Sequence, residues 1–500
     1  MIVLFNPIST SPGKQPLPLS LLSLAAVLEE RSPESGLPRE AWSLVDGNLV
    51  DDPAAEIIAR LSTISRADLA LLAVTVMPGP QLTQAVAVCK RVRHALPHAR
   101  IVWGGYFPTQ HGRTVLRAPY VDFVIRSQGE RSLLQLADVL RKRGLLNGVG
   151  GLSWKAGDQV VENPVQPLTT LDELPELPYH RVDMTRYLHK NYLGTKTVAH
   201  NSSFGCPFAC SFCAVVAMSN RRWLAQSPAR LERTMRHLVA TYKVDAVQMH
   251  DMDFFISEVR TAEFCDRIAH LGLRWWALGR VDRLMEYSDA TWEKMRRSGL
   301  VMVFSGAESG NDEALAGMNK GGKSSVGLTL ELARRMRSYG IVPEFSFVLG
   351  CPPDPVKDVA ANFEFIRRIK RINPATEIVL YTYTPVPMEG DLYGEAQRAG
   401  FAFPDTLEGW VTPEWQQLSM RRGDGIPWLD GAVRRRVRNF ERVINAYYPT
   451  VTELRLNAWH RAALKAASAW RYGLKLYGAP IELRALDRVV HYRRPETTGF

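Results

Sequence analysis

Three closely spaced cysteines are the residues best suited to chemistry in this 500-residue chain. Cys206, Cys210 and Cys213 lie in the stretch NSSFGCPFACSFCAVVAM, with the spacing C-x3-C-x2-C. Three thiolates at this spacing suit three corners of a cubic iron–sulfur cluster and leave one iron open to a small molecule, with the ring of Phe212 beside it. A zinc site would need a fourth protein ligand, so a zinc knuckle or a chance surface cluster is the alternative.

Short apolar runs alternate with helical patterns over the first 145 residues. This alternation predicts a parallel, doubly wound sheet. The expected strands are Ile2–Phe5, Trp42–Val45, Leu69–Val74, Ile101–Trp103 and Phe123–Ile125, and the expected helices lie near 18–30, 53–63, 80–95 and 130–143. Such sheets bind ligands at the carboxyl ends of their strands. The candidate ligand residues at these ends are Asn6, Pro7, Thr75, Met77, Gly104, Gly105, Tyr106, Gln128, Gly129 and Glu130.

Two segments in this region resemble a known cofactor-binding domain. GGYFPT, and VDFVIRSQGE some fifteen residues later, are similar to the cobalamin-binding domain attached to many radical S-adenosylmethionine (SAM) enzymes, in which these loops line the corrin ring. The D-x-H-x-x-G motif that supplies a lower axial histidine is absent, because the loop after the first strand reads NPISTSPG. The resemblance therefore implies a lower face that meets another side chain, water or nothing. A domain that binds nothing is the alternative.

A second series of strand–helix units follows a proline-rich connector. Gly151–Glu162 is typical of a hairpin, and Pro164, Pro167, Pro175 and Pro178 mark a linker, because a proline every few residues interrupts helix and central strand. Six strands are then expected at Lys196–Ser202, Ala246–His250, Trp275–Leu278, Met302–Phe304, Val342–Val348 and Glu377–Tyr383. Six units, with the cysteine motif after the first strand, resemble the partial barrel of the radical SAM superfamily.

Polar segments after the later strands resemble those that hold SAM in that superfamily, where the open iron chelates the amino acid end of SAM. They are HDMDFF, GRVD, SGAESGNDEALAGMNKG with its Asn319–Gly321, and LGCPP. The residues assigned to SAM by this resemblance are Phe212, Asp251, Asp253, Arg280, Glu308, Ser309, Gly350 and Pro352. A carboxylate after the second strand would pair with the SAM ammonium, Arg280 with its carboxylate or the cluster, and Glu308 with the ribose. Each carboxylate alone is more often a helix cap or a surface charge.

The catalytic residues are not determined by the motifs. Cys351, Tyr381 and Tyr383 lie at strand ends and are the candidates, although packing is the competing explanation for each. Cys89 and Cys265 fall among apolar residues of helical segments and are expected to fill the core.

The charge of the chain is concentrated near its end. Residues 421–500 contain 16 Lys and Arg against 7 Asp and Glu, which places +9 of the net +11 there. Two basic helices, Ala432–Ala446 and Asn457–Leu476, are expected to pack on the barrel, and Trp459 and Trp470 among their cations also suit a membrane surface. Nucleic acid is disfavoured because no binding motif accompanies the charge. No apolar run approaches a membrane span, MIVLFNPIST resembles a first strand rather than a secretory signal, and the cysteine usage fits a reducing cytoplasm.

The expected architecture is therefore α/β. It comprises a Rossmann-like cobalamin-binding domain (1–148), a hairpin and linker (149–194), a partial (β/α)6 radical SAM barrel (195–400) and a basic helical region (401–500). The resemblance implies a [4Fe-4S] cluster that cleaves SAM to a 5′-deoxyadenosyl radical, with cobalamin-dependent methylation of an unactivated carbon of a small molecule, and a flavodoxin or ferredoxin as electron donor. A cyclase or rearrangement enzyme acting on a tetrapyrrole, lipid or natural product is the alternative. An iron–sulfur sensor that binds an anionic partner is a third hypothesis.

Overall fold

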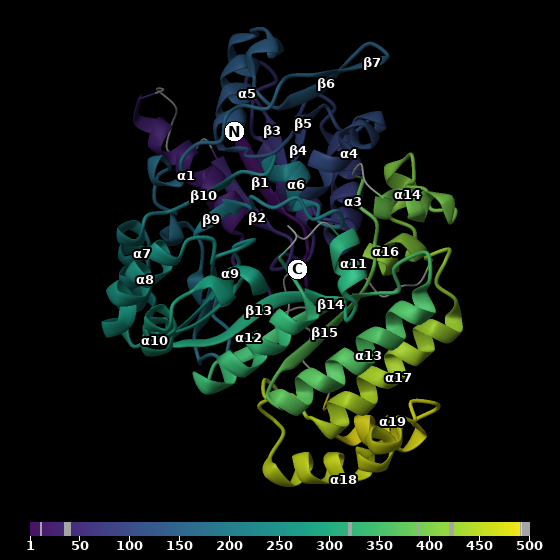
Figure 1. The fold of residues 1–500 in the computed structure, drawn as a ribbon. Coiled ribbons are helices and arrows are strands. Elements are labelled where there is room, and N and C mark those ends of the chain that lie inside the picture. Colours follow the sequence, from purple (N-terminus) through teal and green to yellow (C-terminus); the bar gives the residue numbers. More distant parts are fainter. Residues whose placement is uncertain are drawn as a thin grey trace.

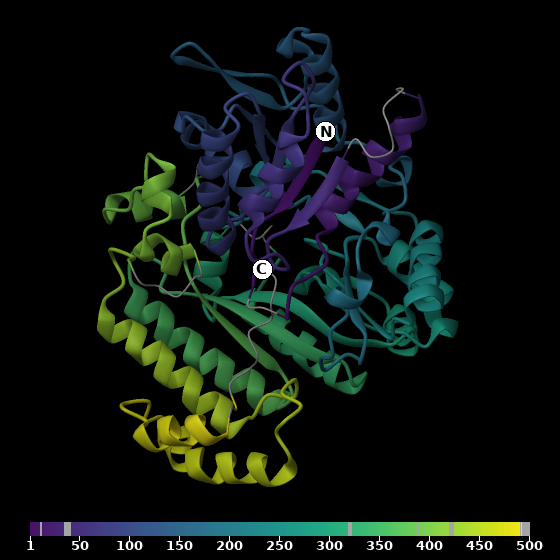
Figure 2. The same cartoon turned by 180° about the vertical axis from the view of Figure 1, so that it is seen from behind.

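The computed structural model describes residues 1–10, 13–34, 42–318, 323–387, 391–419, 425–490 and 492. Within these ranges the chain forms two large sheets with helices against them. Figures 1 and 2 show the N-terminal sheet in the upper half of the molecule and the second sheet in the lower half.

The N-terminal sheet has the strand order β2-β1-β3-β4-β5-β6-β7, and its first five strands are parallel. The strands are β1 (Ile2–Asn6), β2 (Trp42–Asp46), β3 (Leu71–Thr75), β4 (Arg100–Gly104), β5 (Phe123–Ile125), β6 (Leu152–Ala156) and β7 (Gln159–Glu162). The helices are α1 (Leu19–Glu34), α2 (Pro53–Ser62), α3 (Pro80–Ala95), α4 (Tyr106–Arg117) and α5 (Glu130–Lys142). Every strand expected from the sequence is present, and β6 and β7 form the expected hairpin. Helix α4 was not expected, because Gly104–Tyr106 resembled a loop.

The connector to the second sheet contains short 3-10 helices at Leu171–Glu173, Tyr179–Arg181 and Met184–Tyr187, and another such helix, Leu146–Gly148, precedes β6. The connector is held by hydrogen bonds to the N-terminal domain. The Tyr187 hydroxyl donates to Asp46 at the carboxyl end of β2 over 2.8 Å, and the Gln15 side chain donates to the Arg186 carbonyl over 2.7 Å.

The second sheet consists of six parallel strands in sequence order, β8-β11-β12-β13-β14-β15. The strands are β8 (Thr197–His200), β11 (Ala246–Met249), β12 (Arg274–Leu278), β13 (Leu300–Glu308), β14 (Val342–Leu349) and β15 (Glu377–Thr382). The helices between and after them are α7 (Pro228–Tyr242), α8 (Glu258–Ile268), the 3-10 helix Ala269–Leu271, α9 (Val281–Glu286), α10 (Asp289–Arg297), α11 (Asp312–Gly317), α12 (Val326–Ser338), α13 (Pro355–Ile372) and α14 (Asp391–Arg398). Every residue of β14 is buried, as expected for a parallel strand covered on both faces.

The cysteine loop lies between the strands of a small antiparallel hairpin, β9 (Ser203–Gly205) and β10 (Trp223–Ala225), which follows β8. Helix α6 (Val215–Ser219) lies inside this hairpin and contacts α4 of the N-terminal domain. The loop is therefore placed between the two sheets.

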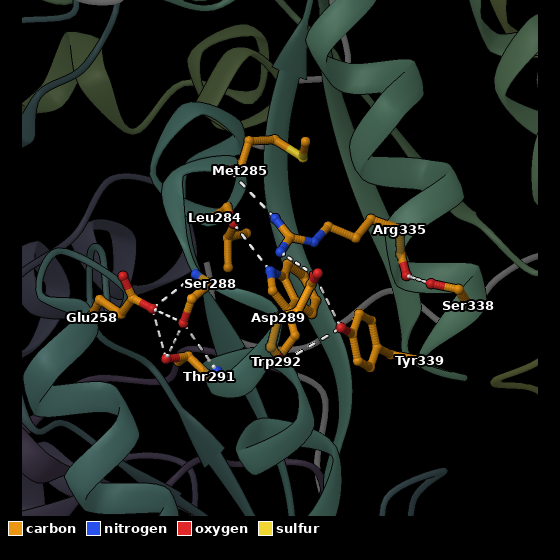
Figure 3. A network of polar contacts seen from close by, with 10 residues as sticks. All are labelled: Glu258, Leu284, Met285, Ser288, Asp289, Thr291, Trp292, Arg335, Ser338 and Tyr339. Carbon is orange, nitrogen blue, oxygen red and sulfur yellow. Dashed lines mark hydrogen bonds and ion pairs between the residues drawn. The ribbon is translucent and has the colours of Figure 1, made fainter.

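The outer helices of the second sheet are locked together by a polar network (Figure 3). Glu258 at the start of α8 accepts hydrogen bonds from the backbone and hydroxyl of Ser288, over 2.8 and 2.7 Å. On the other side, Arg335 of α12 donates to Asp289 over 2.7 Å, and the Tyr339 hydroxyl donates to the same carboxylate over 3.2 Å. Because α9 precedes this junction directly, the network fixes the helix that begins after Arg280.

The C-terminal region divides between the two sheets. Helices α15 (Leu407–Trp410) and α16 (Pro413–Ser419) follow α14, and Leu407 and Trp410 belong to the core of the N-terminal domain, where Trp410 packs edge-on against Phe107. Helices α17 (Gly431–Tyr447), α18 (Ala458–Leu474) and α19 (Ile481–Val489) extend away from that domain, and α17 contacts α13. Phe440 of α17 stacks on Phe363 of α13 with 3.8 Å between ring centroids.

Candidate functional site

The cysteine loop begins at a glycine that no other residue could replace. Gly205 has φ +82°, and a Cβ atom there would lie 2.2 Å from the Arg222 carbonyl oxygen across the hairpin. The turn directs the chain into Cys206. Cys210 is buried, whereas Cys206 and Cys213 are half-buried. None of the six cysteines, all of which lie in the described ranges, forms a disulfide.

A buried arginine lies against the loop. Nη1 of Arg280, which follows β12, donates to Sγ of Cys210 over 3.4 Å, and its guanidinium carbon lies 3.7 Å from the ring centroid of Phe208. Nε and Nη2 of Arg280 donate to the carboxylate of Asp282 over 2.9 and 2.7 Å. The arginine is therefore held in place by the aspartate and directs a positive charge at the cysteine loop. Phe208 was not singled out from the sequence, although it lies inside the motif.

The surroundings of the Cys206 thiol oppose its ionisation. Burial raises the pKa of Cys206 to about 12, against the opposing effect of a hydrogen bond from the Phe208 backbone and with smaller contributions from Asp253, Cys213 and Cys210. Neighbouring thiols resist ionisation in this way unless a cationic metal centre stabilises the thiolates. Among the described residues no three His, Cys, Asp or Glu side chains converge as ligands of one metal ion.

The two aspartates after β11 have different surroundings. Asp251 accepts hydrogen bonds from the backbone and hydroxyl of Ser202, over 3.1 and 2.8 Å, and from the hydroxyl of Ser203, so it ties β8 to β9. Asp253 is 1% exposed, and its Oδ2 atom has no hydrogen-bond partner among the described residues. Burial raises the pKa of Asp253 to about 7, against the opposing effect of Arg280. Of the two, Asp253 has the carboxylate oxygen available to a ligand.

Strained backbone marks the end of β13. Glu308 has φ +58°, a left-handed conformation that is costly for a residue with a side chain, and it lies at a register shift between β13 and β14. Glu308 and Ser309 are both buried, and the Ser309 hydroxyl accepts a hydrogen bond from the backbone of Asn311 over 3.2 Å. Strain of this kind is typical of ligand sites. Asn319, Lys320 and Gly321 lie outside the described residues.

The turn after β14 is held from two sides. Asp358 of α13 accepts hydrogen bonds from the backbone of Gly350 and Cys351, over 2.7 and 3.4 Å, and the Trp428 indole donates to the Gly350 carbonyl over 2.9 Å. Pro352 is buried. Asp358 was not identified from the sequence, because it lies eight residues beyond the turn that it fixes.

The three catalytic candidates lie close to this turn. Cys351 and Tyr383 are buried, and burial raises the pKa of both groups. The backbone of Tyr383 donates to the Leu349 carbonyl over 2.9 Å, and its ring centroid lies 5.9 Å from that of Trp428. Tyr381 in β15 is half-buried, as is Phe212 in the cysteine loop.

The carboxyl edge of the N-terminal sheet lies near α6, the helix after the cysteine loop, because α4, which starts at this edge, contacts α6. Gly105 has φ +95°, and a Cβ atom there would lie 3.0 Å from Oγ1 of Thr75. The side chain of Met77 is 41% exposed at this edge, an apolar group available to a large ligand. Gly104, Gly105 and Tyr106 are half-buried, and the two glycines have no side chain that would keep a ligand away from the backbone here.

The other candidates on this edge have structural partners. Asn6 donates to Asp46 over 3.0 Å. Gln128 exchanges hydrogen bonds with the backbone of Thr169, and Glu130 accepts from the Ser23 hydroxyl over 2.6 Å. Pro7 is buried and Gly129 half-buried.

A serine absent from the sequence-based candidates makes a further contact between the domains. Ser127, after β5, has φ +67°, and its hydroxyl donates to the Met218 carbonyl of α6 over 2.6 Å. Its backbone donates to the Thr109 hydroxyl over 3.1 Å. The loop of the N-terminal sheet is therefore bonded directly to the helix that follows the cysteines.

Two family descriptions match the chain. "B12 binding domain" matches residues 7–137, and "Radical SAM superfamily" matches residues 200–366. The chain is 26% identical over 356 residues to "Uncharacterized methyltransferase PH0819" of Pyrococcus horikoshii, which covers 70% of this chain and 73% of that protein. It is 27% identical over 254 residues to the "Anaerobic magnesium-protoporphyrin IX monomethyl ester cyclase" of a Synechocystis species, half of each chain.

A solved structure has the same fold throughout. The radical SAM methyltransferase TsrM of Kitasatospora setae, with cobalamin and a [4Fe-4S] cluster bound, superposes with a TM-score of 0.65, 16% identity and coverage of 98% of both chains. The arrangement of a B12-binding domain, a radical SAM domain and a helical C-terminal region is thus shared over the whole length.

Proposed function

Because this chain belongs to the radical SAM enzymes that carry a B12-binding domain, we propose that it methylates an unactivated carbon of a small-molecule substrate. The observation that carries the proposal is the hydrogen bond from Ser127 to Met218, because it joins the ligand edge of the N-terminal sheet to α6, the helix that follows the three cysteines. Methyl transfer between two cofactors and a substrate needs the three reacting groups in one enclosed place. The family members named in the comparisons include a methyltransferase with this domain order.

The residues of this chain would divide the binding of the cofactors as follows. Cys206, Cys210 and Cys213 would hold the [4Fe-4S] cluster. When bound, the cofactors supply one-electron cleavage of SAM and a transferable methyl group. Arg280 donates a hydrogen bond to Cys210, which stabilises the thiolate form of that cysteine. Asp253 would accept a hydrogen bond from the SAM ammonium at its unpartnered Oδ2 atom.

The remaining strand ends would hold SAM and cobalamin and exclude water. Glu308 and Ser309 would accept and donate hydrogen bonds to the ribose of SAM, while the turn from Gly350 to Pro352 would contact its adenine. Trp428, from the C-terminal region, donates to Gly350 and so helps to fix this turn. On the opposite edge, Thr75, Met77, Gly104, Gly105 and Tyr106 would contact cobalamin. We place the domain boundaries near 148, 194 and 400.

The test is an anaerobic assay of the full chain reconstituted with iron, sulfide and cobalamin. With SAM and a chemical reductant we expect 5′-deoxyadenosine together with S-adenosylhomocysteine. Replacement of Cys206, Cys210 and Cys213 by Ala should remove bound iron and both products. Cys265→Ala, which changes a buried cysteine of α8 outside the loop, should retain them. Continued SAM cleavage by the triple variant would refute the proposal.

A second candidate is a cyclase, favoured by the relative of that name. The two functions separate in the same assay when substrate is supplied. A methyltransferase forms S-adenosylhomocysteine in proportion to product, whereas a cyclase forms 5′-deoxyadenosine without it. Absence of any SAM cleavage after reduction would favour the sensor hypothesis over both.

A further inference from the structure

The C-terminal helices expose an unusual amount of apolar surface. Thirteen large apolar side chains are markedly exposed in the described ranges, and seven of them lie between residues 454 and 489. Trp459 is 81% exposed, Leu474 67% and Ile481 69%. The others in this segment are Leu454, Trp470, Leu476 and Val489. A concentration of this kind on a globular protein marks an interaction surface.

The exposed residues of α18 recur at helical spacing. The outward positions are Trp459, Ala462, Ala463, Ala466, Ala469, Trp470, Gly473 and Leu474, and the inward positions Leu464, Ser468, Arg471 and Tyr472 are buried. Among the exposed positions of α18 only Lys465 carries a charge. The helix therefore presents an apolar stripe to solvent, with a tryptophan toward each end. We call this stripe, together with Leu476 and Ile481, the α18 face.

The α18 face lies at one extremity of the molecule. Figures 1 and 2 both show α18 as the outermost helix at the end opposite the N-terminal sheet. Helix α19 lies beside it and contacts it, so Ile481 extends the apolar surface past the end of α18. A face at the end of the molecule can meet an extended surface without a clash from the rest of the chain.

The charges around the α18 face are cationic, because the nearby acids are neutralised within the protein. Glu482 accepts hydrogen bonds from Arg471, and Glu453 pairs with Arg455 over 2.9 Å. Asp487 pairs with Arg442 over 3.7 Å. The exposed cations of the segment are Arg455, Lys465, Lys475, Arg484 and Arg488. Lys475 pairs with Glu364 of α13 over 2.9 Å and Arg455 with Glu453, so Lys465, Arg484 and Arg488 supply the positive charge of this surface.

The positive charge around the α18 face favours an anionic lipid surface over a second copy of the chain as its binding partner. A second copy of the chain would bring the same lysines and arginines together, and like charges across an interface oppose association. An anionic lipid surface would attract them, while tryptophans at the ends of an apolar stripe suit the boundary between headgroups and acyl chains. We propose that the α18 face docks this protein on the surface of a bilayer that contains anionic phospholipid, with α18 in the plane of the membrane.

The test is flotation of the full chain with vesicles of phosphatidylcholine alone or with 30% phosphatidylglycerol. We expect binding to the anionic vesicles that is at least about tenfold tighter and weakens with salt, because each cation near such a surface raises affinity about fivefold. Brominated acyl chains should quench tryptophan fluorescence, and the Trp459→Ser substitution should reduce that quenching.

Matched variants distinguish binding through the α18 face from nonspecific binding through exposed apolar side chains. Trp459→Ser/Leu474→Ser/Ile481→Ser should weaken binding roughly 100-fold, because three exposed apolar groups no longer enter the interface. The control variant Leu145→Ser/Val259→Ser/Val356→Ser removes three exposed apolar side chains outside the α18 face. It should bind the vesicles as the unaltered protein does.

Three results would overturn the proposal. They are equal binding of the unaltered protein to neutral and anionic vesicles, no binding to either, and undiminished binding by the α18 variant. Sedimentation without lipid tests the other occupant, because a dimer that the α18 variant loses would assign the face to a second copy. Every substituted side chain is exposed, so circular dichroism should show all variants folded.

Discussion

Replacement of Arg280 tests how strongly the buried ion pair beside the cysteine loop stabilises β12 and α9, the elements that carry it. Arg280 and Asp282 are 7% and 4% exposed and share two hydrogen bonds. Arg280→Met would leave the Asp282 carboxylate buried without its cation, a change that typically costs 3–5 kcal/mol. The backbone of Arg283 still donates to Asp282, over 3.1 Å, so we expect the lower end, about 3 kcal/mol.

The assay is hydrogen–deuterium exchange of the apo-protein, read from peptides that cover β12 and α9. A local measurement is needed because a chain with several domains does not unfold in one step. Destabilisation by about 3 kcal/mol corresponds to roughly 150-fold faster exchange through local opening. The double variant Arg280→Met/Asp282→Asn should recover most of the loss, because neither charge is then left unpaired.

Arg283→Met is the matched control. Arg283 pairs with Glu286 over 2.6 Å, but the two side chains are 35% and 41% exposed, so the loss should stay below about 1 kcal/mol. The reasoning is refuted if Arg280→Met accelerates exchange no more than Arg283→Met does. It is equally refuted if the effects of Arg280→Met and Asp282→Asn simply add.

Three further predictions concern strain and buried titratable groups. Glu308→Gly should be more stable than Glu308→Ala by about 1 kcal/mol in exchange of β13 peptides, because only glycine adopts φ +58° without strain. Burial lowers the pKa of His111 to about 4, so local stability relative to His111→Leu should fall by up to about 3 kcal/mol as the pH falls from 6.5 to 4; exchange of α4 peptides measures this, and an equal fall in His111→Leu would contradict it. Burial lowers the pKa of Lys370 to about 8, so the stability of the protein relative to the Lys370→Met variant should rise by up to about 3 kcal/mol from pH 8 to 10.5. A stability difference between the two proteins that does not change with pH would contradict this.

Local sequence patterns were sufficient for most of the secondary structure, and they failed where distant contacts decide. The expected strand Met302–Phe304 extends in the structure over Leu300–Glu308, because pairing with β14 keeps the polar stretch after Phe304 extended. Helix α4 starts directly after Gly105, and its Pro108 lies in the first turn, where a proline is tolerated. In both cases small or polar residues resembled a loop.

In the C-terminal region, local sequence patterns also failed to show to which domain a segment belongs. Residues 401–419 were grouped with the basic helices, yet Leu407 and Trp410 pack in the N-terminal core and Glu408 pairs with Lys90 over 2.7 Å. Nothing in the local composition indicates this, because the contact joins segments about 300 residues apart.

The sequence by itself determined the fold class, the succession of parallel strands with polar segments after them, and the cysteine motif. Periodic placement of apolar residues and the C-x3-C-x2-C spacing are properties of neighbouring residues, so they can be recognised without a structure. Only the tertiary structure separated Asp251, which is bonded to Ser202, from Asp253, whose Oδ2 atom has no partner among the described residues. It also placed Ser127 against Met218 and the α18 face in solvent. The physical reason is that burial and hydrogen-bond partners depend on residues far apart in the chain, which a local pattern does not contain.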